Sequence, residues 1–312
     1  MDRFTCIGVF VTAVDEGSFA AAARRFGLSA AMAGKYVSAL EAELNARLLQ
    51  RTTRRLSLTD VGHAYYDRCK WILEAFDEAN REASDSQNIA RGVLRIAAPV
   101  TFGAMHLGGV VARYMEEHPH VNVEVLLNDR YADLLDIGAD VAIRIGRLRD
   151  SGLVARRIAP CRMAVCASPG YLKRYGTPRT PDDLRRAPRL VFSEAVSAGD
   201  WTLIDTKNRA HVIDGPSRMS ANNMQMLLAA ALAGAGVAYG PTFVFGEYLA
   251  RGELVALFPS YRASELTIQA VYPSARHVPL KVRQFIDHLV DAFGDQPPWD
   301  CVRPLHREQV VS

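Results

Sequence analysis

The segment from Ser18 to Thr59 constrains the fold of this chain more than any other part. Its sequence is SFAAAARRFGLSAAMAGKYVSALEAELNARLLQRTTRRLSLT. Ser18 and Ser29 lie where a side-chain oxygen would cap a helix, and Gly27 lies where the first helix would end in a left-handed turn. The sequence therefore predicts two short helices joined by a tight turn, followed by an arginine-rich arm.

The second of these helices has two different faces. Ala33, Val37, Leu40 and Leu44 recur at helical spacing, which is typical of a face packed into a core. In a helix-turn-helix the opposite face of the second helix enters the DNA major groove. The residues that we predict on this face are Ser29, Ala30, Ala31, Gly34, Lys35 and Ser38.

The arm after the second helix is strongly basic. Between Asn45 and Leu58 it contains four arginines and no acidic residue, and its alternating leucines suit a small β-wing. An arginine cluster alone is typical of a solvated surface, but after a helix-turn-helix it favours contact with phosphates and the minor groove. The residues predicted to make these contacts are Arg51, Thr52, Thr53, Arg54 and Arg55.

Residues 1–90 resemble the N-terminal part of the LysR-type transcriptional regulators. The resemblance is carried by an opening helix at Phe4–Glu16, by GSFAAAARRFGLS and by ALEAELNARLLQRTTRRLSLTDVG. One difference concerns the start of the second helix, where the family usually has polar side chains and this chain has Ala30 and Gly34. Lys35 is then almost alone as a donor to guanine, and Gly34, which costs a helix about 1 kcal/mol, indicates close approach or crowding of the backbone.

A single long helix is predicted from Asp60 to Ala90, with Thr59 as its N-cap. Apolar residues recur along it at spacings of three and four, which indicates a partner for one face. That partner is either the body of its own domain or a second copy of the chain. The resemblance implies a linker helix that pairs two subunits, so we expect a homodimer or homotetramer on paired DNA half-sites, with a hinge at Ser84–Arg91.

After Gly92 the pattern changes to alternating strands and helices. Strands are expected at Val93–Ala98, Val121–Leu127, Ala139–Ile145, Met163–Ala167, Leu190–Phe192, Gly236–Tyr239 and Glu265–Tyr272. Helices are expected at His106–Glu117, Tyr131–Ile137 and Leu280–Phe293. The resemblance implies two α/β subdomains like those of periplasmic binding proteins, the first at 92–162 and 268–293 and the second at 163–267. Residues 294–312 are expected to form a loose tail.

A small-molecule effector is implied between these subdomains. Ligands of such folds bind where the carboxyl ends of strands lead into helices. The candidate effector-binding residues are Thr101, Phe102, Asn128, Arg144, Ser193, Asn222 and Thr242. For Thr101 and Phe102 a simple helix cap is an equal alternative, and Arg144 could instead pair with Asp140. A small organic anion, aromatic in character, is the expected effector.

The remaining features exclude several classes of protein. The chain has 312 residues, a net charge of +3 and five cysteines, none in a CxxC pair. We expect reduced, buried thiols in a cytoplasmic protein, although Cys161 and Cys166 leave a redox switch conceivable. The uncharged stretch Met226–Gly246 is long enough to span a bilayer, but its glycines and proline favour an α/β core instead.

No enzyme motif is recognised in the chain. The sequence GAGVAY at 234–239 lacks the last glycine of a dinucleotide loop, and it would follow a helix rather than a strand. His118 and His120 in an HPH turn are more typical of a surface than of a metal site, so neither metal nor cofactor is expected. The alternative functions are a solute-binding protein, which would need export, and an enzyme with an incidental helix-turn-helix.

Overall fold

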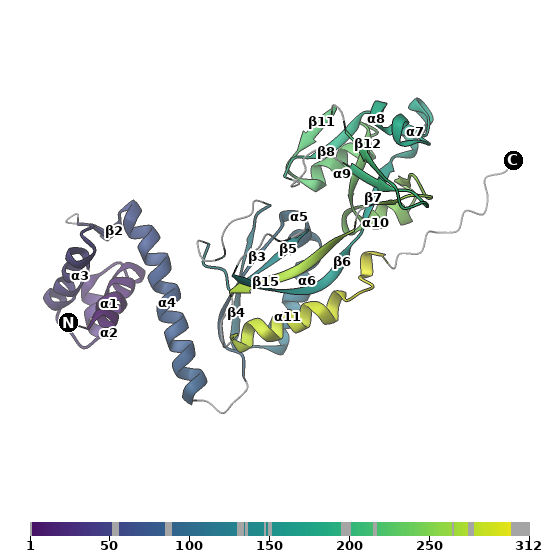
Figure 1. The fold of residues 1–312 in the computed structure, drawn as a ribbon. Coiled ribbons are helices and arrows are strands. Elements are labelled where there is room, and N and C mark those ends of the chain that lie inside the picture. The colour runs from purple at the N-terminus through teal and green to yellow at the C-terminus, as the bar shows by residue number, and fades with distance from the viewer. Residues whose placement is uncertain are drawn as a thin grey trace. The chain divides into compact units, whose positions relative to one another are not determined.

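The computed structural model of the chain has two separate units, residues 1–88 and residues 89–312. It describes residues 2–51, 56–84, 89–129, 134, 137–146, 148, 152–194, 201–214, 217–263, 265–273 and 278–300, and the side chains of 51, 74 and 77–84 are not included in that description. The two units are considered separately below (Figure 1).

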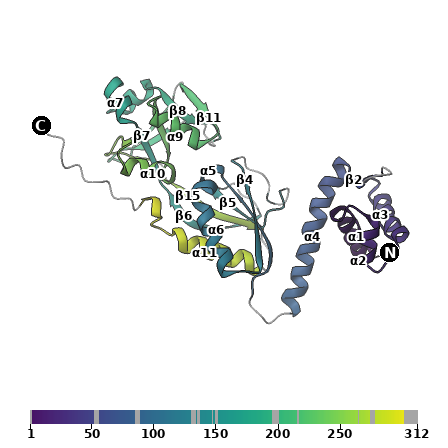
Figure 2. The same ribbon diagram turned by 180° about the vertical axis from the view of Figure 1, so that it is seen from behind.

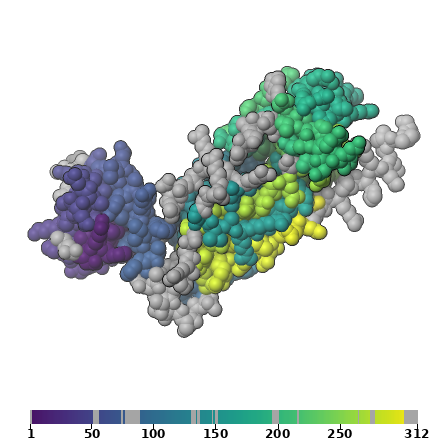
Figure 3. Space-filling view, viewed as in Figure 1, coloured from purple at the N-terminus to yellow at the C-terminus, as the bar shows by residue number. Residues whose placement is uncertain are grey.

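The first unit is a small helical body with a β-wing and one long helix. Its helices are α1 (Arg3–Asp15), α2 (Phe19–Arg25), α3 (Ala30–Leu44) and α4 (Asp60–Ser84), and its strands are β1 (Leu49–Arg51) and β2 (Leu56–Leu58). Val9 and Phe10 of α1 are completely buried against Ala33 and Val37 of α3. In Figures 1 and 3 the blue helix α4 runs alongside the purple helices.

The long helix begins as predicted and ends earlier than predicted. Thr59 caps it, because its Oγ1 accepts a hydrogen bond from the Gly62 amide at 2.9 Å. The helix is described to Ser84, whereas Ile89 and Ala90, which were predicted to be helical, are not in a helix. Cys69 is buried in the core of the unit, whereas Phe76 is 47% exposed. The apolar stripe is therefore divided between the unit's own core and solvent.

The second unit begins with a five-stranded mixed sheet. Its order is β4-β3-β5-β15-β6, formed by β3 (Gly92–Ala98), β4 (Val121–Leu127), β5 (Val141–Ile145), β6 (Leu153–Cys161) and β15 (Leu266–Pro273). Strands β3, β4 and β5 are parallel, so their carboxyl ends share one edge. Helices α6 (Gly108–Glu117) and α11 (Leu280–Phe293) cover one face, as Figures 1 and 2 show.

A second five-stranded sheet follows in the same unit. Its order is β11-β8-β12-β7-β13, formed by β7 (Met163–Ala167), β8 (Arg189–Phe192), β11 (Met219–Ala221), β12 (Val237–Pro241) and β13 (Val255–Ala256). Helices α9 (Met224–Leu232) and α10 (Thr242–Ala250) pack on one face. The other face packs on α7 (Pro169–Tyr175), α8 (Pro181–Arg186) and a small sheet of β9 (Trp201–Ile204), β10 (Ala210–Ile213) and β14 (Arg262–Ala263).

These two sheets confirm the predicted fold class of two α/β subdomains. Only Arg162 separates β6 of the first sheet from β7 of the second, so the chain crosses between the subdomains there. The chain returns just before β15. The subdomain boundaries given above are consistent with this arrangement and stay a prediction. The uncharged stretch at 226–246 forms α9, β12 and the start of α10, as the α/β reading predicts.

Several predicted elements differ from the structure. The helix expected at His106 begins earlier, because α5 (Val100–Phe102) and a π-helix, η1 (Gly103–Leu107), lead into α6. The helix expected at 131–137 falls mostly outside the described residues. The tail is not loose throughout: η2 (Pro298–Asp300) buries Trp299, which is only 7% exposed. Residues 301–312 lie outside the described part of the chain.

Candidate DNA-binding and effector-binding sites

The turn between α2 and α3 is built from backbone contacts and two serine caps. Ser18 Oγ accepts a hydrogen bond from the Ala20 amide, and Ser29 Oγ accepts one from the Met32 amide, each at 3.2 Å. Gly27 has a φ of +64°, a left-handed conformation that favours glycine. The Leu28 amide then donates to the Ala23 carbonyl at 2.8 Å and closes the turn. These contacts fix the direction in which α3 leaves the turn.

Helix α3 presents a polar, small-residue face to solvent. Ala33, Val37 and Leu40 are at most 1% exposed, so one face is packed into the core as predicted. The residues predicted to contact DNA lie on the other side: Ser29, Ala30, Ala31, Lys35 and Ser38 are exposed and Gly34 is half-buried. Their exposure agrees with the helical pattern, whereas their contact with DNA stays a prediction.

Gly34 is not crowded by its own chain. A Cβ added there would meet nothing within 4 Å. Crowding inside the described part of the protein is therefore not the reason for a glycine at this position. The other reason given by the sequence, close approach of the backbone, stays a prediction. Ser38 Oγ donates a hydrogen bond to the Gly34 carbonyl at 2.9 Å, so the hydroxyl is bound to the backbone of its own helix.

The wing is an antiparallel ribbon anchored to α3. Arg51 pairs with Leu56 at the end of β1 and β2. Glu41 of α3 accepts hydrogen bonds from the Leu48 and Leu49 amides at 2.9 and 3.1 Å, which ties the first strand to the helix. Thr52, Thr53, Arg54 and Arg55 lie outside the described residues. Their predicted contacts with DNA therefore stay a prediction from sequence.

A polar cavity of about 180 Å³ lies between the two sheets of the second unit. It is lined by Val100, Leu127, Asn128, Asp129, Glu194, Asn222 and Asn223. The first four follow or end β3 and β4, and the last three follow β8 and β11, whose ends also pair in parallel. Carboxyl ends of parallel strands are where ligands bind in such folds.

Two carboxylates and three amides give this cavity its character. Asp129 Oδ1 accepts a hydrogen bond from the Val100 amide at 2.9 Å and so fixes the start of α5. Burial raises the pKa of Asp129, and the negative charge of Glu194 adds to that rise. Asn223 caps α9 by accepting a hydrogen bond from the Met226 amide at 3.1 Å. Among the described lining residues there is no cationic side chain.

Comparison with known proteins identifies both units. The model of the bacterial regulatory helix-turn-helix protein, lysR family, matches residues 6–63, and that of the LysR substrate binding domain matches residues 87–294. The chain belongs to the LysR family of transcriptional regulators. It is 39% identical over 284 residues to an uncharacterized HTH-type transcriptional regulator of Haemophilus influenzae, covering 90% of this chain and 98% of that protein.

Two further relatives extend over nearly the whole chain. The HTH-type transcriptional regulator PtxR of Pseudomonas aeruginosa is 37% identical, with 92% of each chain covered. The solved structure of CrgA, a LysR-type regulator of Neisseria meningitidis, has a TM-score of 0.61 at 31% identity and covers 93% of this chain and 98% of that one. The family and fold predicted from the sequence are therefore confirmed.

The structure brings together only part of the predicted effector site. Asn128 and Asn222 line the cavity from opposite subdomains. Ser193 lies in the turn just before Glu194, and its amide donates to the Ala221 carbonyl at 2.9 Å. Asp129, Glu194 and Asn223 also line the cavity but are not among the candidates predicted from the sequence. The position of Asp129 after β4 was a signal that could have found it, since it directly follows a predicted residue at a strand end.

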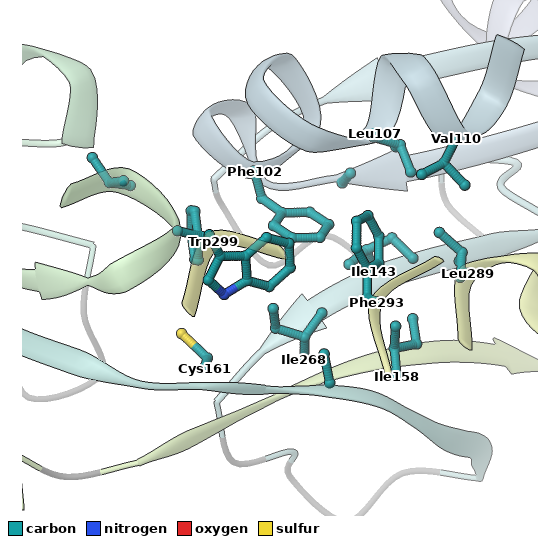
Figure 4. Packing of buried hydrophobic residues seen from close by; sticks show 14 of the residues in the cluster. Phe102, Leu107, Val110, Ile143, Ile158, Cys161, Ile268, Leu289, Phe293 and Trp299 are labelled. Carbon is teal, nitrogen blue, oxygen red and sulfur yellow. The ribbon is translucent and has the colours of Figure 1, made fainter. Parts of the chain in front are cut away.

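Phe102, predicted as an effector contact, does not line this cavity. It is completely buried, and its ring contacts those of Phe243, Phe293 and Trp299 at centroid distances of 5.4, 5.7 and 5.9 Å. Figure 4 shows it directed into this cluster beside Trp299. An aromatic residue at a helix start met the pattern for a ligand contact, but the core between the subdomains takes up its ring.

The other three candidates do not line the cavity. Thr101 is 4% exposed, and its hydroxyl has no hydrogen-bond partner within the described residues. Arg144 is buried in β5, next to Gln269 of β15. Thr242 begins α10, where its amide and its hydroxyl both donate to the Arg162 carbonyl, at 2.8 and 3.2 Å. Thr242 therefore holds the crossover between the subdomains.

The acid that could have paired with Arg144 has other partners. Asp140 Oδ2 accepts from the Arg95 amide at 2.9 Å and lies 3.5 Å from Lys281 Nζ. Lys281 is itself buried and also donates to the Val93 carbonyl at 2.7 Å. These contacts join α11 to β3 and stabilise the first sheet, so they serve the fold rather than the cavity.

The described cysteines are all free and buried. Burial raises the pKa of Cys161 and of Cys166 to about 12 each. The thiolate is the reactive form of cysteine, so these two thiols are poorly suited to a redox switch at neutral pH. No helix in the described part of the chain is long and apolar enough to cross a membrane. In the same residues no group of three or more His, Cys, Asp or Glu side chains is placed to hold a metal ion.

Proposed function

We propose that this LysR-family regulator reads a specific DNA sequence through the exposed face of α3, with the β-wing on the DNA backbone. The observation that supports the proposal is the division of α3 into a completely buried face and an exposed one that holds Lys35. Only the exposed face is free to enter a major groove. Lys35 would donate to a guanine edge, and the methyl groups of Ala30 and Ala31 would contact thymine.

Pairing of two chains through α4 completes this proposal. Val61, Trp71, Ile72 and Phe76 of α4 are between 37% and 56% exposed, which is unusual for large apolar side chains on one helix. A second copy of α4 would cover them, and a two-fold dimer would present two α3 helices to paired half-sites. The Ile72→Glu variant is expected to be monomeric by analytical ultracentrifugation, whereas Asp67→Asn is expected to keep the oligomeric state of the wild type.

DNA binding is tested by fluorescence anisotropy of the full-length protein on the DNA just upstream of its own gene. A scrambled duplex is the control, at about 0.15 M salt, where loose electrostatic binding is weak. Clear preference for the native duplex supports a sequence-specific regulator. Equal binding to both duplexes, with strong salt dependence, would leave a basic arm without base reading.

The cavity between the subdomains is proposed as the effector site, with a ligand unlike the anion expected from the sequence. Asp129 and Glu194 would repel a carboxylate, whereas they and the asparagine oxygens accept hydrogen bonds. The ligand favoured by this lining is small and carries ammonium, amide or hydroxyl donors. A ligand that binds one relative position of the subdomains more tightly than another would shift the equilibrium between these positions.

The ligand class is tested by thermal unfolding of the full-length protein with matched amines and carboxylates. Ethanolamine and 1,4-diaminobutane are compared with glycolate and succinate at equal ionic strength. A rise in Tm with the amines that is lost in Glu194→Gln, but kept in a variant of the exposed Glu116, supports the proposal. A rise with the carboxylates instead would reject it.

The regulator's place and chemistry follow from these proposals. A protein that reads chromosomal DNA acts in the cytoplasm, so we propose that location. We also propose that it performs no reaction of its own. A solute-binding protein would share the C-terminal fold, but the helix-turn-helix unit favours the regulator.

A further inference from the structure

The chain crosses between the subdomains a third time after its last long helix. Helix α11 packs on the first sheet and ends at Phe293, and residues 294–297 then lead to η2 at Pro298–Asp300. The Trp299 ring lies against His106, Phe293 and Phe102 of the first subdomain, with centroid distances of 4.6, 5.1 and 5.9 Å. It also lies 6.0 Å from Phe243 of the second subdomain. Figure 4 shows the indole beside the ring of Phe102.

The backbone of η2 packs directly on α10 of the second subdomain. A Cβ added at Gly246 would lie 2.5 Å from the Trp299 carbonyl oxygen, so only glycine allows this approach. Trp299 thus sends its side chain toward the first subdomain while its backbone rests on the second. A relative movement of the two subdomains must disturb one of these contacts.

The same segment also holds the crossover residue. Arg162 lies alone between β6 and β7, and its Nη1 is paired with the Asp300 carboxylate. Its Nε lies 3.7 Å from Oε2 of Glu265, which directly precedes β15 on the returning crossover. The side chain of Asp300 is only 13% exposed. One short segment therefore contacts both subdomains and the first crossover, and Arg162 links that crossover to Glu265 on the returning one.

We propose that residues 294–300 act as a strap that holds the two subdomains in one relative position and so sets how much effector binding is needed to move them. This regulatory role rests on the proposed function, whereas the mechanical role of the strap does not. The Trp299 ring fills the apolar space between the subdomains, and the Asp300–Arg162 pair fixes the crossover. Releasing either contact widens the range of poses that the subdomains sample.

The two subdomains also contact each other directly, so the strap is not their sole connection in the described part of the chain. His106 Nε2 lies 2.8 Å from the Phe243 carbonyl oxygen, and Phe102 packs on Phe243. Burial lowers the pKa of His106, so its ring is neutral near pH 7 and Nε2 carries the proton donated to that carbonyl. His106 belongs to the π-helix η1, a helix form found frequently at functional sites. The strap acts beside this contact, so its loss loosens the pose without separating the subdomains.

The test measures the distance between subdomains in the full-length protein. Donor and acceptor dyes are attached at Glu116→Cys on α6 and Tyr175→Cys on α7, both exposed positions, in a Cys301→Ser background. Single-molecule energy transfer is compared for wild type, Trp299→Ala and Asp300→Asn. The matched control is Asp295→Asn, because the ion pair of Asp295 with Arg157 of β6, at 3.1 Å, lies within the first subdomain and does not join the two. Removal of residues 301–312 is a second control.

If residues 294–300 act as a strap, the distribution of the dye-to-dye distance broadens in Trp299→Ala and broadens less in Asp300→Asn. Both controls keep the wild-type distribution. Exchange of the Thr242 amide, which is bonded to the crossover carbonyl, should rise by roughly tenfold or more in Trp299→Ala. An unchanged distribution in both variants, with only a lower Tm, would make Trp299 an ordinary core residue and overturn the proposal. If Trp299→Ala does not fold, Trp299→Phe and Asp300→Asn decide. DNA anisotropy on the same samples reports separately on the proposed function.

Discussion

The predicted DNA-binding face and the proposed effector cavity are built in opposite ways. The predicted DNA-binding face lies on helix α3 and its N-cap, and its residues come from a stretch of ten between Ser29 and Ser38. The cavity takes residues from Val100 to Asn223, which meet only because two sheets bring their strand ends together. In the first region a local pattern determines which side chains are exposed. In the second region, strand pairing between distant parts of the chain determines which side chains are exposed. Two residues adjacent in sequence can therefore differ completely in burial.

The largest expected effect is a difference in the free energy of unfolding between a core variant and a cavity variant of the second unit. Phe102→Ala should reduce the free energy of unfolding by about 3–5 kcal/mol, because it removes a completely buried ring from a packed cluster. Asn128→Ala, in the exposed wall of the cavity, should change it by less than about 0.5 kcal/mol. Urea unfolding followed by tryptophan fluorescence measures both. A Phe102→Ala protein of native stability would return this residue to the list of effector contacts.

The next prediction divides the DNA-binding face from its wing. Lys35→Ala should reduce discrimination between bases by about 1–3 kcal/mol, the range for a good contact with a base edge. Arg54→Ala should weaken binding to every duplex and lower the salt slope by about 0.9, because one phosphate contact is lost. Anisotropy titrations at several salt concentrations, on native and scrambled duplexes, distinguish the two. Equal weakening on both duplexes in Lys35→Ala would make that lysine a phosphate contact.

The same contrast explains what the sequence predicted. The helix-turn-helix, the Thr59 cap and helix α11 at Leu280–Phe293 follow from local caps and periodicity, and the structure confirms them. A strand of the small sheet, Arg262–Ala263, was missed because a short edge strand depends on partners far along the chain, here Ile204 and Leu203 of β9. The burial of Phe102 and of Trp299 was not predicted, for a related reason. Their burial comes from an aromatic cluster that joins residues 102, 243, 293 and 299, and no local pattern indicates it.

A smaller effect tests whether Gly34 serves the DNA or the fold. Gly34→Ala should raise the stability of the N-terminal unit by about 1 kcal/mol, because the added methyl group meets no atom within 4 Å and alanine is the better helix former. DNA binding should weaken in the same variant if the groove approaches the helix at this point. Ala31→Gly on the same face should lose about as much stability as Gly34→Ala gains. A more stable variant that binds DNA like wild type would show that the glycine is not a contact position.

The smallest effect concerns the charge of the cavity. Because the pKa of Asp129 is raised in the folded protein, its ionisation favours the unfolded state above the ordinary pKa of 3.8. The cost is absent at lower pH, where both states are protonated, and it is fully present once the pH exceeds the raised pKa. Asp129→Asn keeps an oxygen for the Val100 amide but carries no charge. We therefore expect its Tm to exceed that of wild type at pH 7 and to equal it near pH 3.

Glu194 supplies the control for that result, since its charge adds to the rise of the Asp129 pKa. Glu194→Gln should reproduce part of the gain in Tm at pH 7, and the double variant should gain less than the sum of the two single ones. Strict additivity would mean that the two carboxylates do not interact across the cavity. A cavity without that interaction would no longer disfavour an anion. Its charge would then not distinguish the proposed effector site from the basic arm of the N-terminal unit.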